Sequence, residues 1–218
     1  MAYNVVEIFD SIEGEGKRTG APASFIRLAG CNLRCAYCDT SYALKGEHST
    51  LSLGSILSRL NRRFRRVTLT GGEPLIAPNV DKLIKHMLAD GFEVNIETNG
   101  SVDITPFRQE INMNLFFTMD YKLNTSEMNS QMFMDNFFQL QPWDVIKFVI
   151  GSKEDVSHMI DVLHHISPVQ PLVYVHSVYG GYDLKELAHT ILHTPVLKNV
   201  RLGVQLHKIV WDPFTRGV

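Results

Sequence analysis

The chain has 218 residues, 44% of them hydrophobic and 20% charged, which are the proportions of a soluble globular protein. Its 21 basic and 23 acidic residues leave a formal net charge of −2, so no overall basic field indicates a nucleic-acid partner. No apolar run reaches the roughly 20 residues that cross a bilayer, and the amino terminus lacks the pattern of a secretion signal. We therefore expect a single cytoplasmic domain over residues 1–218, without a membrane partner.

Short β-rich runs alternate with amphipathic helical runs, which favours an α/β fold built from βα units with a mostly parallel sheet. Six strands are expected, at residues 23–28, 66–70, 93–97, 115–119, 145–150 and 172–176, with a further extended segment at residues 200–209. A complete eight-unit barrel takes about 250 residues, so this chain predicts an incomplete barrel of the (β/α)6 type. In such folds the site lies at the carboxyl ends of the strands.

The helices between these strands are predicted from apolar residues at i, i+3, i+4 and i+7 spacing. They are expected around residues 53–60, 80–88, 156–163 and 184–192. Ser152 and Asp183 are expected to cap the last two. The stretch from residue 110 to 141 is rich in Met, Asn and Phe and has the weakest pattern, and residues 124–134 are expected to be irregular or mobile.

All three cysteines of the chain, Cys31, Cys35 and Cys38, lie in one segment, CNLRCAYC. Because their number is odd and they lie so close together, a disulfide framework is excluded, and a metal is the better explanation in a reducing compartment. Four thiolates normally close an iron–sulfur cluster, so three would leave one iron of a four-iron cluster open for chemistry. A zinc site of three cysteines with His48, or buried inert thiols, are the alternatives.

A second motif, TLTGGEP, runs from Thr68 to Pro74 at the end of the second expected strand. Two glycines let the backbone come close to a ligand, and the carboxylate of Glu73 can accept hydrogen bonds from an ammonium group. Taken alone, the motif is explained as a plain strand-to-helix turn. Beside the cysteine segment, it indicates a ligand site.

The cysteine spacing, with Tyr37 just before the last cysteine, resembles the radical S-adenosylmethionine superfamily, and TLTGGEP resembles its second signature. That resemblance implies a [4Fe-4S] cluster whose open iron is chelated by S-adenosylmethionine. One electron from the cluster then cleaves the sulfonium to methionine and a 5′-deoxyadenosyl radical. It also implies that Gly71, Gly72 and Glu73 hold the methionine amino group.

Further segments resemble one family within that superfamily, the 7-carboxy-7-deazaguanine synthases. They are EIFDSIEGEG at residues 7–16, FIRLAGC and CDT around the cysteines, ETNG at residues 97–100, and QLHK at residues 205–208. The resemblance implies a carbon–nitrogen lyase that contracts the ring of 6-carboxy-5,6,7,8-tetrahydropterin with loss of ammonia, in the biosynthesis of queuosine and related 7-deazapurines. It also implies Mg²⁺, a reductant protein such as a flavodoxin, and a homodimer.

The family's functional residues carry over by position. Cys31, Cys35 and Cys38 are the implied cluster ligands, and Thr40 is the implied Mg²⁺ ligand. The implied substrate-binding residues are Ile12, Glu13, Gly14, Arg27, Thr98 and His207. The implied cofactor-binding residues are Tyr37, Cys38, Asp39, Gly71, Gly72, Glu73, Gly100, Asp120, Tyr121, Lys122 and His176.

The chain departs from the family pattern at three places. Glu13 stands where the family commonly has glutamine, and Asp120 and Tyr121 stand where it usually has Ser-Pro. The chain also continues past the histidine near which shorter members end, so a role for the terminal carboxylate is not carried over.

Two charged residues lie inside expected apolar strands. Arg27 needs a partner there, and its guanidinium suits either the substrate carboxylate or a neighbouring glutamate in a structural ion pair. Lys147 is a second interior charge to which the sequence assigns no role.

Two other functions are compatible with the cysteine segment. One is a radical activase that makes a glycyl radical on a partner protein, whose cysteine spacing can be identical. The other is a non-enzymatic iron–sulfur or zinc module, which would not need an open iron.

Overall fold

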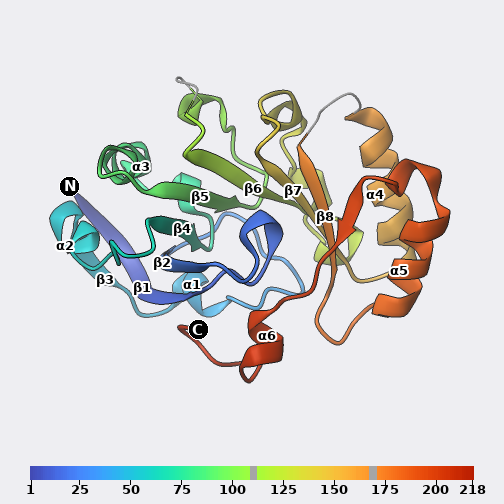
Figure 1. Cartoon of the computed structure of the whole chain (residues 1–218), viewed down its shortest axis with the longest axis horizontal. Coiled ribbons are helices and arrows are strands. Elements are labelled where there is room, and N and C mark those ends of the chain that lie inside the picture. Colours follow the sequence, from blue (N-terminus) through green and yellow to red (C-terminus); the bar gives the residue numbers. More distant parts are fainter. Residues whose placement is uncertain (109–111, 167–170) are drawn as a thin grey trace.

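A single sheet organises the computed structural model, which describes residues 1–108, 112–166 and 171–218 (Figure 1). Within those residues the sheet has nine strands in the order β3-β1-β2-β4-β5-β6-β7-β8-β9. Their bounds are β1 Ala2–Ile12, β2 Pro22–Leu28, β3 Ser49–Ser52, β4 Arg66–Gly71, β5 Glu93–Thr98, β6 Leu115–Tyr121, β7 Val145–Ile150, β8 Leu172–Ser177 and β9 Val200–Leu202. Strands β2 and β4 to β9 run parallel, while β1 pairs antiparallel with both β2 and β3.

The predicted α/β class and all six predicted strands are confirmed. The sequence analysis missed β1 and β3. In β1 only the first half alternates clearly, with Tyr3 and Val5 buried, whereas the later residues are half-buried on both faces. The extended segment expected at residues 200–209 was only partly right, because the strand ends at Leu202 and residues His207–Val210 form the helix α6.

Helices lie along the outer face of the sheet, except α6, which lies apart from that face near the carboxyl terminus (Figure 1). They are α1 Tyr42–Lys45, α2 Leu53–Leu57, α3 Val80–Ala89, α4 Lys153–His165, α5 Leu184–His193 and α6. The four predicted helices are α2 to α5, and they bury apolar side chains such as Leu83, Met159 and Leu187. The side chains of Ser152 and Asp183 accept hydrogen bonds from the third residues of α4 and α5, as predicted, and each cap contributes about 1 kcal/mol.

Short 3-10 turns make up much of the remaining chain: η1 Gly16–Arg18, η2 Pro74–Ile76, η3 Thr105–Phe107, η4 Asn124–Ser126, η5 Asn129–Gln131, η6 Met134–Phe138 and η7 Pro195–Leu197. Three of them fall in the stretch that the sequence marked as irregular. None of the helices in the described part of the chain is long and apolar enough to cross a membrane.

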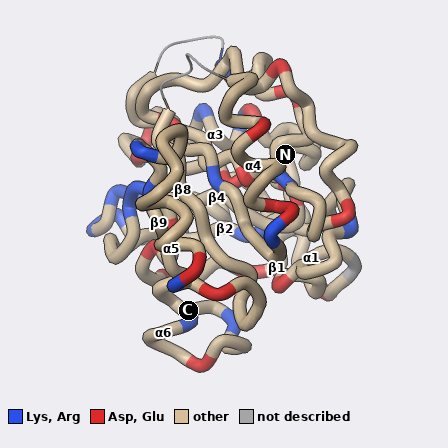
Figure 2. Tube along the Cα trace, turned by 90° about the vertical axis from the view of Figure 1, so that its right-hand side faces the viewer, with Lys and Arg blue, Asp and Glu red and all other residues tan. Residues whose placement is uncertain are grey.

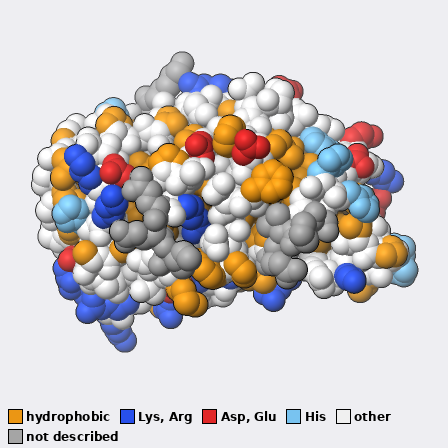
Figure 3. Space-filling model, turned by 90° about the horizontal axis from the view of Figure 1, so that it is seen from above, with side chains coloured by type: hydrophobic (Ala, Val, Ile, Leu, Met, Phe, Trp, Pro, Cys, Tyr) orange, Lys and Arg blue, Asp and Glu red, His pale blue; other side chains and the backbone are white. Residues whose placement is uncertain are grey.

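Charges of both signs are interspersed along the chain trace, in keeping with its near-neutral sum (Figure 2). Histidines gather at the end of the molecule where α4 and α5 lie (Figure 3). His164 and His165 occupy the last turn of α4, and His193 that of α5, where the helix dipole favours positive charge.

Residues 13–21, between β1 and β2, fold back across the centre of the sheet (Figure 1). They fill the barrel from the amino ends of its strands, and we call them the plug. Lys17 Nζ lies 3.4 Å from the centroid of the Phe116 ring and donates a 2.9 Å hydrogen bond to the carbonyl of Trp143. Arg18 donates to the carbonyls of Val67 and Glu93, each at 3.3 Å. This plug leaves the carboxyl ends of the strands as the place for a site.

Asp144 provides a test of how much the buried polar contacts contribute to the stability of the fold. Its side chain is fully buried, accepts from the backbone N–H groups of Phe117 at 2.8 Å and Gln141 at 2.6 Å, and pairs with Arg108. Asp144→Ala leaves these donors without an acceptor, so we expect urea unfolding to show a loss of about 3–5 kcal/mol in the free energy of unfolding.

The matched control is Asp90→Ala, which removes the exposed pair with Arg62 and should cost less than about 1 kcal/mol. Equal losses in the two variants would contradict this account of Asp144.

Candidate functional site

The cysteine loop follows β2 at the carboxyl edge of the sheet, and its three thiols are free and half-buried. Cys31 Sγ accepts from the N–H of Leu33 at 3.4 Å and from Asn99 Nδ2 at 3.7 Å. Burial raises the pKa of Cys35, and the nearby charge of Lys122 opposes this shift.

These thiols suit a cluster better than a single ion. In the described residues no three His, Cys, Asp or Glu side chains gather around one point as ligands of one metal ion would. In an iron–sulfur cluster each thiolate binds its own iron, so the sulfurs need not converge. His48, the fourth ligand of the alternative zinc site, is exposed and its Nδ1 lies 3.4 Å from the carbonyl of Gly46. The zinc alternative therefore has no support in the geometry.

Two glycines bring the turn after β4 against the cysteine loop. A Cβ on Gly71, which has φ +152°, would lie 2.2 Å from the carbonyl oxygen of Leu28. A Cβ on Gly72 would lie 2.2 Å from the carbonyl oxygen of Gly30 and 2.6 Å from Cys31 Cβ. Only glycine fits this close approach, which packs the turn directly against the backbone that leads into the cysteine loop.

Glu73 is fully buried next to this turn. It accepts hydrogen bonds from the N–H of Asn99 at 2.7 Å and from Leu75 N and Thr98 Oγ1 at 3.0 Å each. Burial raises its pKa to about 7, although these hydrogen bonds oppose the shift. A buried carboxyl group without a cationic partner fits the ammonium group that the sequence analysis expected here. The Thr98 hydroxyl donates its hydrogen to Glu73, so its oxygen can meet a substrate only as an acceptor.

A network of ion pairs crosses the barrel interior and supplies the partners of Lys147, the interior charge to which the sequence assigned no role. Its Nζ lies 2.7 Å from Glu15 Oε2 and 3.0 Å from Asp120 Oδ2, and Lys122 Nζ also lies 3.0 Å from Asp120 Oδ2. Burial alone would lower the pKa of Lys147, but the two carboxylates raise it well above its usual range. Burial alone would raise the pKa of Glu15, but Lys147 holds it well below its usual range.

Several buried polar atoms next to this ion-pair network lack a hydrogen-bond partner among the described residues. They are Glu15 Oε1, Tyr37 Oη, Asp120 Oδ1 and both ring nitrogens of His176. Buried polar atoms are nearly always partnered in folded proteins, so such a group, drawn from several elements, marks the place of a polar ligand. Tyr37, Asp120 and His176 were predicted to bind the cofactor, and Glu15 was missed although the EGEG segment contains it.

Because side chains alternate in direction along a strand, Tyr121 points away from this group of unpartnered atoms. Asp120 and Lys122 face the barrel, whereas the Tyr121 ring packs in the core, with ring centroids 5.6 Å from Phe137 and 5.7 Å from Phe148. A cofactor contact at Tyr121 would have to come from its backbone. Gly100, with φ +77°, lies near Met119 and Met132 just after β5.

Glu13 is engaged within the protein. Its side chain is 1% exposed and is held by the guanidinium of Arg18 and the hydroxyl of Thr68. Burial raises the pKa of Glu13 to about 6, against the effect of Arg18. The carboxylate of Glu13 thus joins the plug to β4. Of its neighbours, Ile12 pairs with Pro22 at the end of β1, and the carbonyl of Gly14 accepts from the N–H of Leu206 at 3.0 Å.

Arg27 has a glutamate partner, as one of the two interpretations expected. Its Nε donates to Glu7 Oε1 at 2.7 Å, and the same oxygen accepts from Tyr42 Oη at 3.0 Å. No acceptor is recorded for Nη1 or Nη2 of Arg27 in the described part of the chain. This edge of the guanidinium remains open for a carboxylate, so the structural pair and a substrate role are compatible. The carboxyl-terminal tail lies close by, with the guanidinium of Arg216 3.9 Å from the Tyr42 ring centroid.

The remaining predicted site residues, His207, Asp39 and Thr40, lie at the rim of the site. His207, at the start of α6, packs on Gly14 so closely that a Cβ there would lie 2.0 Å from His207 Nδ1. Lys208 Nζ lies 3.1 Å from Asp39 Oδ2, which links α6 to the cysteine loop. Thr40 Oγ1 lies 3.8 Å from Cys38 Sγ.

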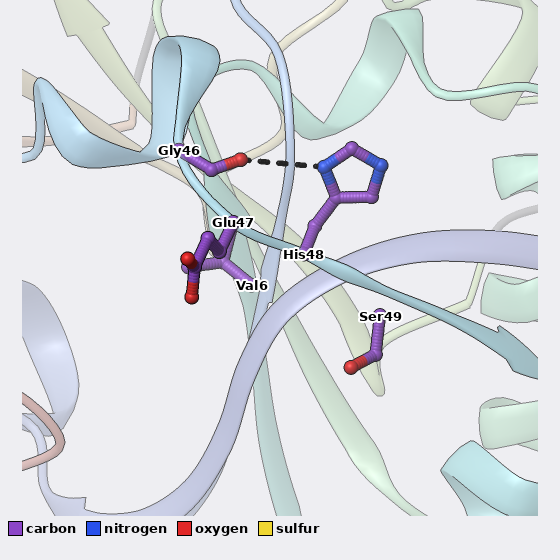
Figure 4. Close-up of a pocket in the computed structure, with 5 residues that line it drawn as sticks. All are labelled: Val6, Gly46, Glu47, His48 and Ser49. Atoms are coloured by element: carbon purple, nitrogen blue, oxygen red, sulfur yellow. Dashed lines mark hydrogen bonds between the residues drawn. The ribbon is translucent and has the colours of Figure 1, made fainter.

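A surface hollow lies elsewhere, between β1 and the start of β3 (Figure 4). It is lined by Val6, Gly46, Glu47, His48 and Ser49. It is open and shallow and has no convergent set of polar groups, so it carries no chemistry. The site is instead the polar interior of the barrel next to the cysteines.

Comparisons with known proteins agree with this geometry. A family model described as the Radical SAM superfamily matches residues 25–192. The 7-carboxy-7-deazaguanine synthase of Clostridium acetobutylicum is 39% identical over 223 residues that cover all of both chains. That of Thermoplasma acidophilum is 33% identical over 95% of this chain and 96% of its own.

Among solved structures, QueE from Escherichia coli matches with a TM-score of 0.74 and 25% identity over 94% of both chains. SuiB from Streptococcus suis bound to S-adenosylmethionine matches with a TM-score of 0.59 at 15% identity, over 80% of this chain and 48% of its own, and shares the fold alone. The incomplete barrel predicted from the sequence is therefore the radical SAM fold.

The pKa of Glu13 predicts a pH dependence of stability. Because this pKa is about 6 in the folded protein and 4.5 is its ordinary value, the folded state binds the proton more tightly than the unfolded chain. The contribution of Glu13 to the free energy of unfolding is therefore fully present below about pH 4.5, and about 2 kcal/mol of it is lost as the pH rises through 6.

Glu13→Gln removes this titration. We expect the difference in free energy of unfolding between the wild type and Glu13→Gln, measured with urea, to shift against the wild type by about 2 kcal/mol between pH 4.5 and 7. If the difference instead moved in favour of the wild type over this range, the pKa of Glu13 would be lowered by Arg18 more than it is raised by burial.

Proposed function

The chain belongs to the 7-carboxy-7-deazaguanine synthase family of the radical SAM superfamily, and from this we propose how its residues carry out that reaction. The enzyme is a carbon–nitrogen lyase, and its proposed substrate is 6-carboxy-5,6,7,8-tetrahydropterin. Ring contraction with loss of one ammonia converts this pterin into 7-carboxy-7-deazaguanine, with no net oxidation or reduction. The single observation that carries the proposal is the open Nη edge of Arg27 in a barrel whose mouth holds the three cysteines.

The two alternatives from the sequence do not fit. A glycyl-radical activase or a non-enzymatic module would not be expected among relatives that match over the whole chain and are named as synthases. The unpartnered polar atoms inside the barrel suit a small polar substrate and cofactor better than electron transfer alone.

The cysteine loop would hold a [4Fe-4S] cluster through Cys31, Cys35 and Cys38, with S-adenosylmethionine at the open iron. When bound, this pair supplies a carbon-centred radical that takes a hydrogen atom from the substrate and later returns it. The chain's own part is to hold both molecules in place. Glu73 and the Gly71–Gly72 backbone are arranged to take an ammonium group, and Tyr37 and His176 offer unpartnered polar atoms to the cofactor.

On the substrate side, Arg27 would bind the carboxylate through its Nη edge while Glu7 keeps its guanidinium oriented through Nε. His207 and the backbone of residues 12–14 would line the opposite rim, since Gly14 and His207 are in contact. Thr40 would add its hydroxyl to a Mg²⁺ ion whose other ligands are water and substrate oxygens. A flavodoxin-like reductant, a homodimer and a cytoplasmic location complete the proposal, supported by the clustered free thiols and by the family.

The test is an anaerobic assay of reconstituted protein with S-adenosylmethionine, Mg²⁺, a reductant and the tetrahydropterin. We expect 7-carboxy-7-deazaguanine and ammonia in equal amounts. If the brown, cluster-loaded protein with about four irons per chain released neither product, the proposed function would be wrong.

Arg27→Ala tests the carboxylate site. Loss of a charge-assisted contact should lower kcat/KM by about a hundredfold or more while the iron content stays unchanged. Cys35→Ala, in contrast, should lose both the cluster and the activity.

The matched control is Arg62→Ala, which removes an exposed arginine that is likewise paired with a carboxylate, that of Asp90, and lies over an aromatic ring, that of Phe92. It should keep full activity. An Arg27→Ala enzyme with unchanged kcat/KM would show that the Arg27–Glu7 pair is structural only.

A further inference from the structure

Glu97 lies inside the barrel at the carboxyl end of β5. Along this strand Val94 and Ile96 are fully buried beneath the helices, so Asn95 and Glu97 face the barrel. Asn95 confirms this direction, because its side-chain oxygen accepts from the hydroxyl of Thr118 across the barrel wall at 2.9 Å. Glu97 is only half-buried, so a ligand in the barrel can reach it.

The carboxylate of Glu97 is close to several groups of the site. It adds to the effect of burial in raising the pKa of Glu13. It adds to the carboxylates of Asp120 and Glu15 in raising the pKa of Lys147. It also opposes the effect of burial that lowers the pKa of His207. The charge of Glu97 thus acts on groups of the plug, of the ion-pair network and of the rim.

Of the other carboxyl groups of the interior, Glu73 is met by three hydrogen bonds and the rest have cationic partners. Glu13 pairs with Arg18, Glu15 with Lys147, and Asp120 with Lys147 and Lys122. For Glu97 no ion pair or hydrogen bond is recorded in residues 1–108, 112–166 and 171–218. A carboxylate in a half-buried interior is costly unless a donor meets it, so the donor is expected on the ligand.

We propose that Glu97 is a substrate-binding residue that accepts the paired hydrogen bonds of the pterin's 2-amino group and its N3–H. This inference rests on the proposed function and goes beyond it, because it assigns the recognition of the pterin ring. An amino group next to a ring N–H presents two parallel donors, as a guanidinium does, and a carboxylate accepts them with both oxygens.

The sheet register supports this placement. Arg27 on β2 is level with Thr70 on β4, and the pairing of Thr68 with Asn95 continues to bring Thr70 level with Glu97. Arg27 and Glu97 are therefore two strand spacings apart, about 10 Å along the sheet. The 6-carboxylate and the 2-amino group lie at opposite ends of the pterin's long axis. One molecule can thus meet Arg27 with its carboxylate and Glu97 with its donor edge.

The experiment compares two ligands that the enzyme does not turn over. 6-Carboxypterin has the 2-amino group, and 6-carboxylumazine has a carbonyl oxygen in its place. Binding to the cluster-loaded protein with S-adenosylmethionine is measured by isothermal titration calorimetry. We expect the wild type to prefer 6-carboxypterin by about tenfold or more, because the lumazine carbonyl faces a carboxylate. In Glu97→Gln, whose amide can donate to that carbonyl, we expect the preference to fall below about threefold.

Glu93→Gln is the matched control, since Glu93 lies on the same face of β5 at its amino end, near Arg18 and Arg66. It should keep the wild-type preference, and the melting temperatures of all variants show that they are folded. A Glu97→Gln protein that kept the full preference, or a wild type without any, would overturn the role of Glu97. Turnover of the tetrahydropterin by the wild type is measured separately, so this result leaves the proposed function standing.

Discussion

The structure depends on the pairing of charges inside the barrel. An ionised side chain taken out of water is costly unless an opposite charge or several hydrogen bonds meet it. Here the partners come from different elements: Glu15 from the segment after β1, Lys147 from β7, and Asp120 from β6. Each pair therefore joins a segment to the sheet as well as lowering a desolvation cost. The plug after β1 is held in the same way, by Glu13 and Arg18.

This pairing explains why the site lies where it does. At the amino ends of the strands, Thr68, Arg18 and Glu13 bond to one another. At the carboxyl ends, buried atoms of Tyr37 and His176 lack partners among the described residues. Five of the unpartnered buried atoms, from Glu15, Tyr37, Asp120 and His176, thus lie on the side of the barrel that the cysteine loop borders. Natural proteins commonly leave such local conflicts at functional sites.

Much of this arrangement could be predicted from the sequence. Periodicity located six of the seven parallel strands in the described residues and the helices α2 to α5, because those elements have clear apolar faces, and the caps Ser152 and Asp183 were predicted correctly. The cysteine loop and the GGE turn were recognised because their chemistry depends on short spacings along the chain. β1 was missed because its second half is half-buried on both faces and so does not alternate.

Contacts between distant elements were harder to predict. Nothing local in the sequence shows that Lys147 meets Glu15, because 132 positions separate them and only the sheet order brings them together. The partners within EGEG could not be predicted for the same reason: Glu13 points to Arg18 and β4, and Glu15 points to β7. Alternation along β5 likewise separates Thr98, which serves Glu73, from Glu97, which faces the barrel. In a parallel barrel a shift of one residue along a strand moves a side chain from the site to the outer wall, so the register, more than the motif, decides which residue of a conspicuous segment meets the substrate.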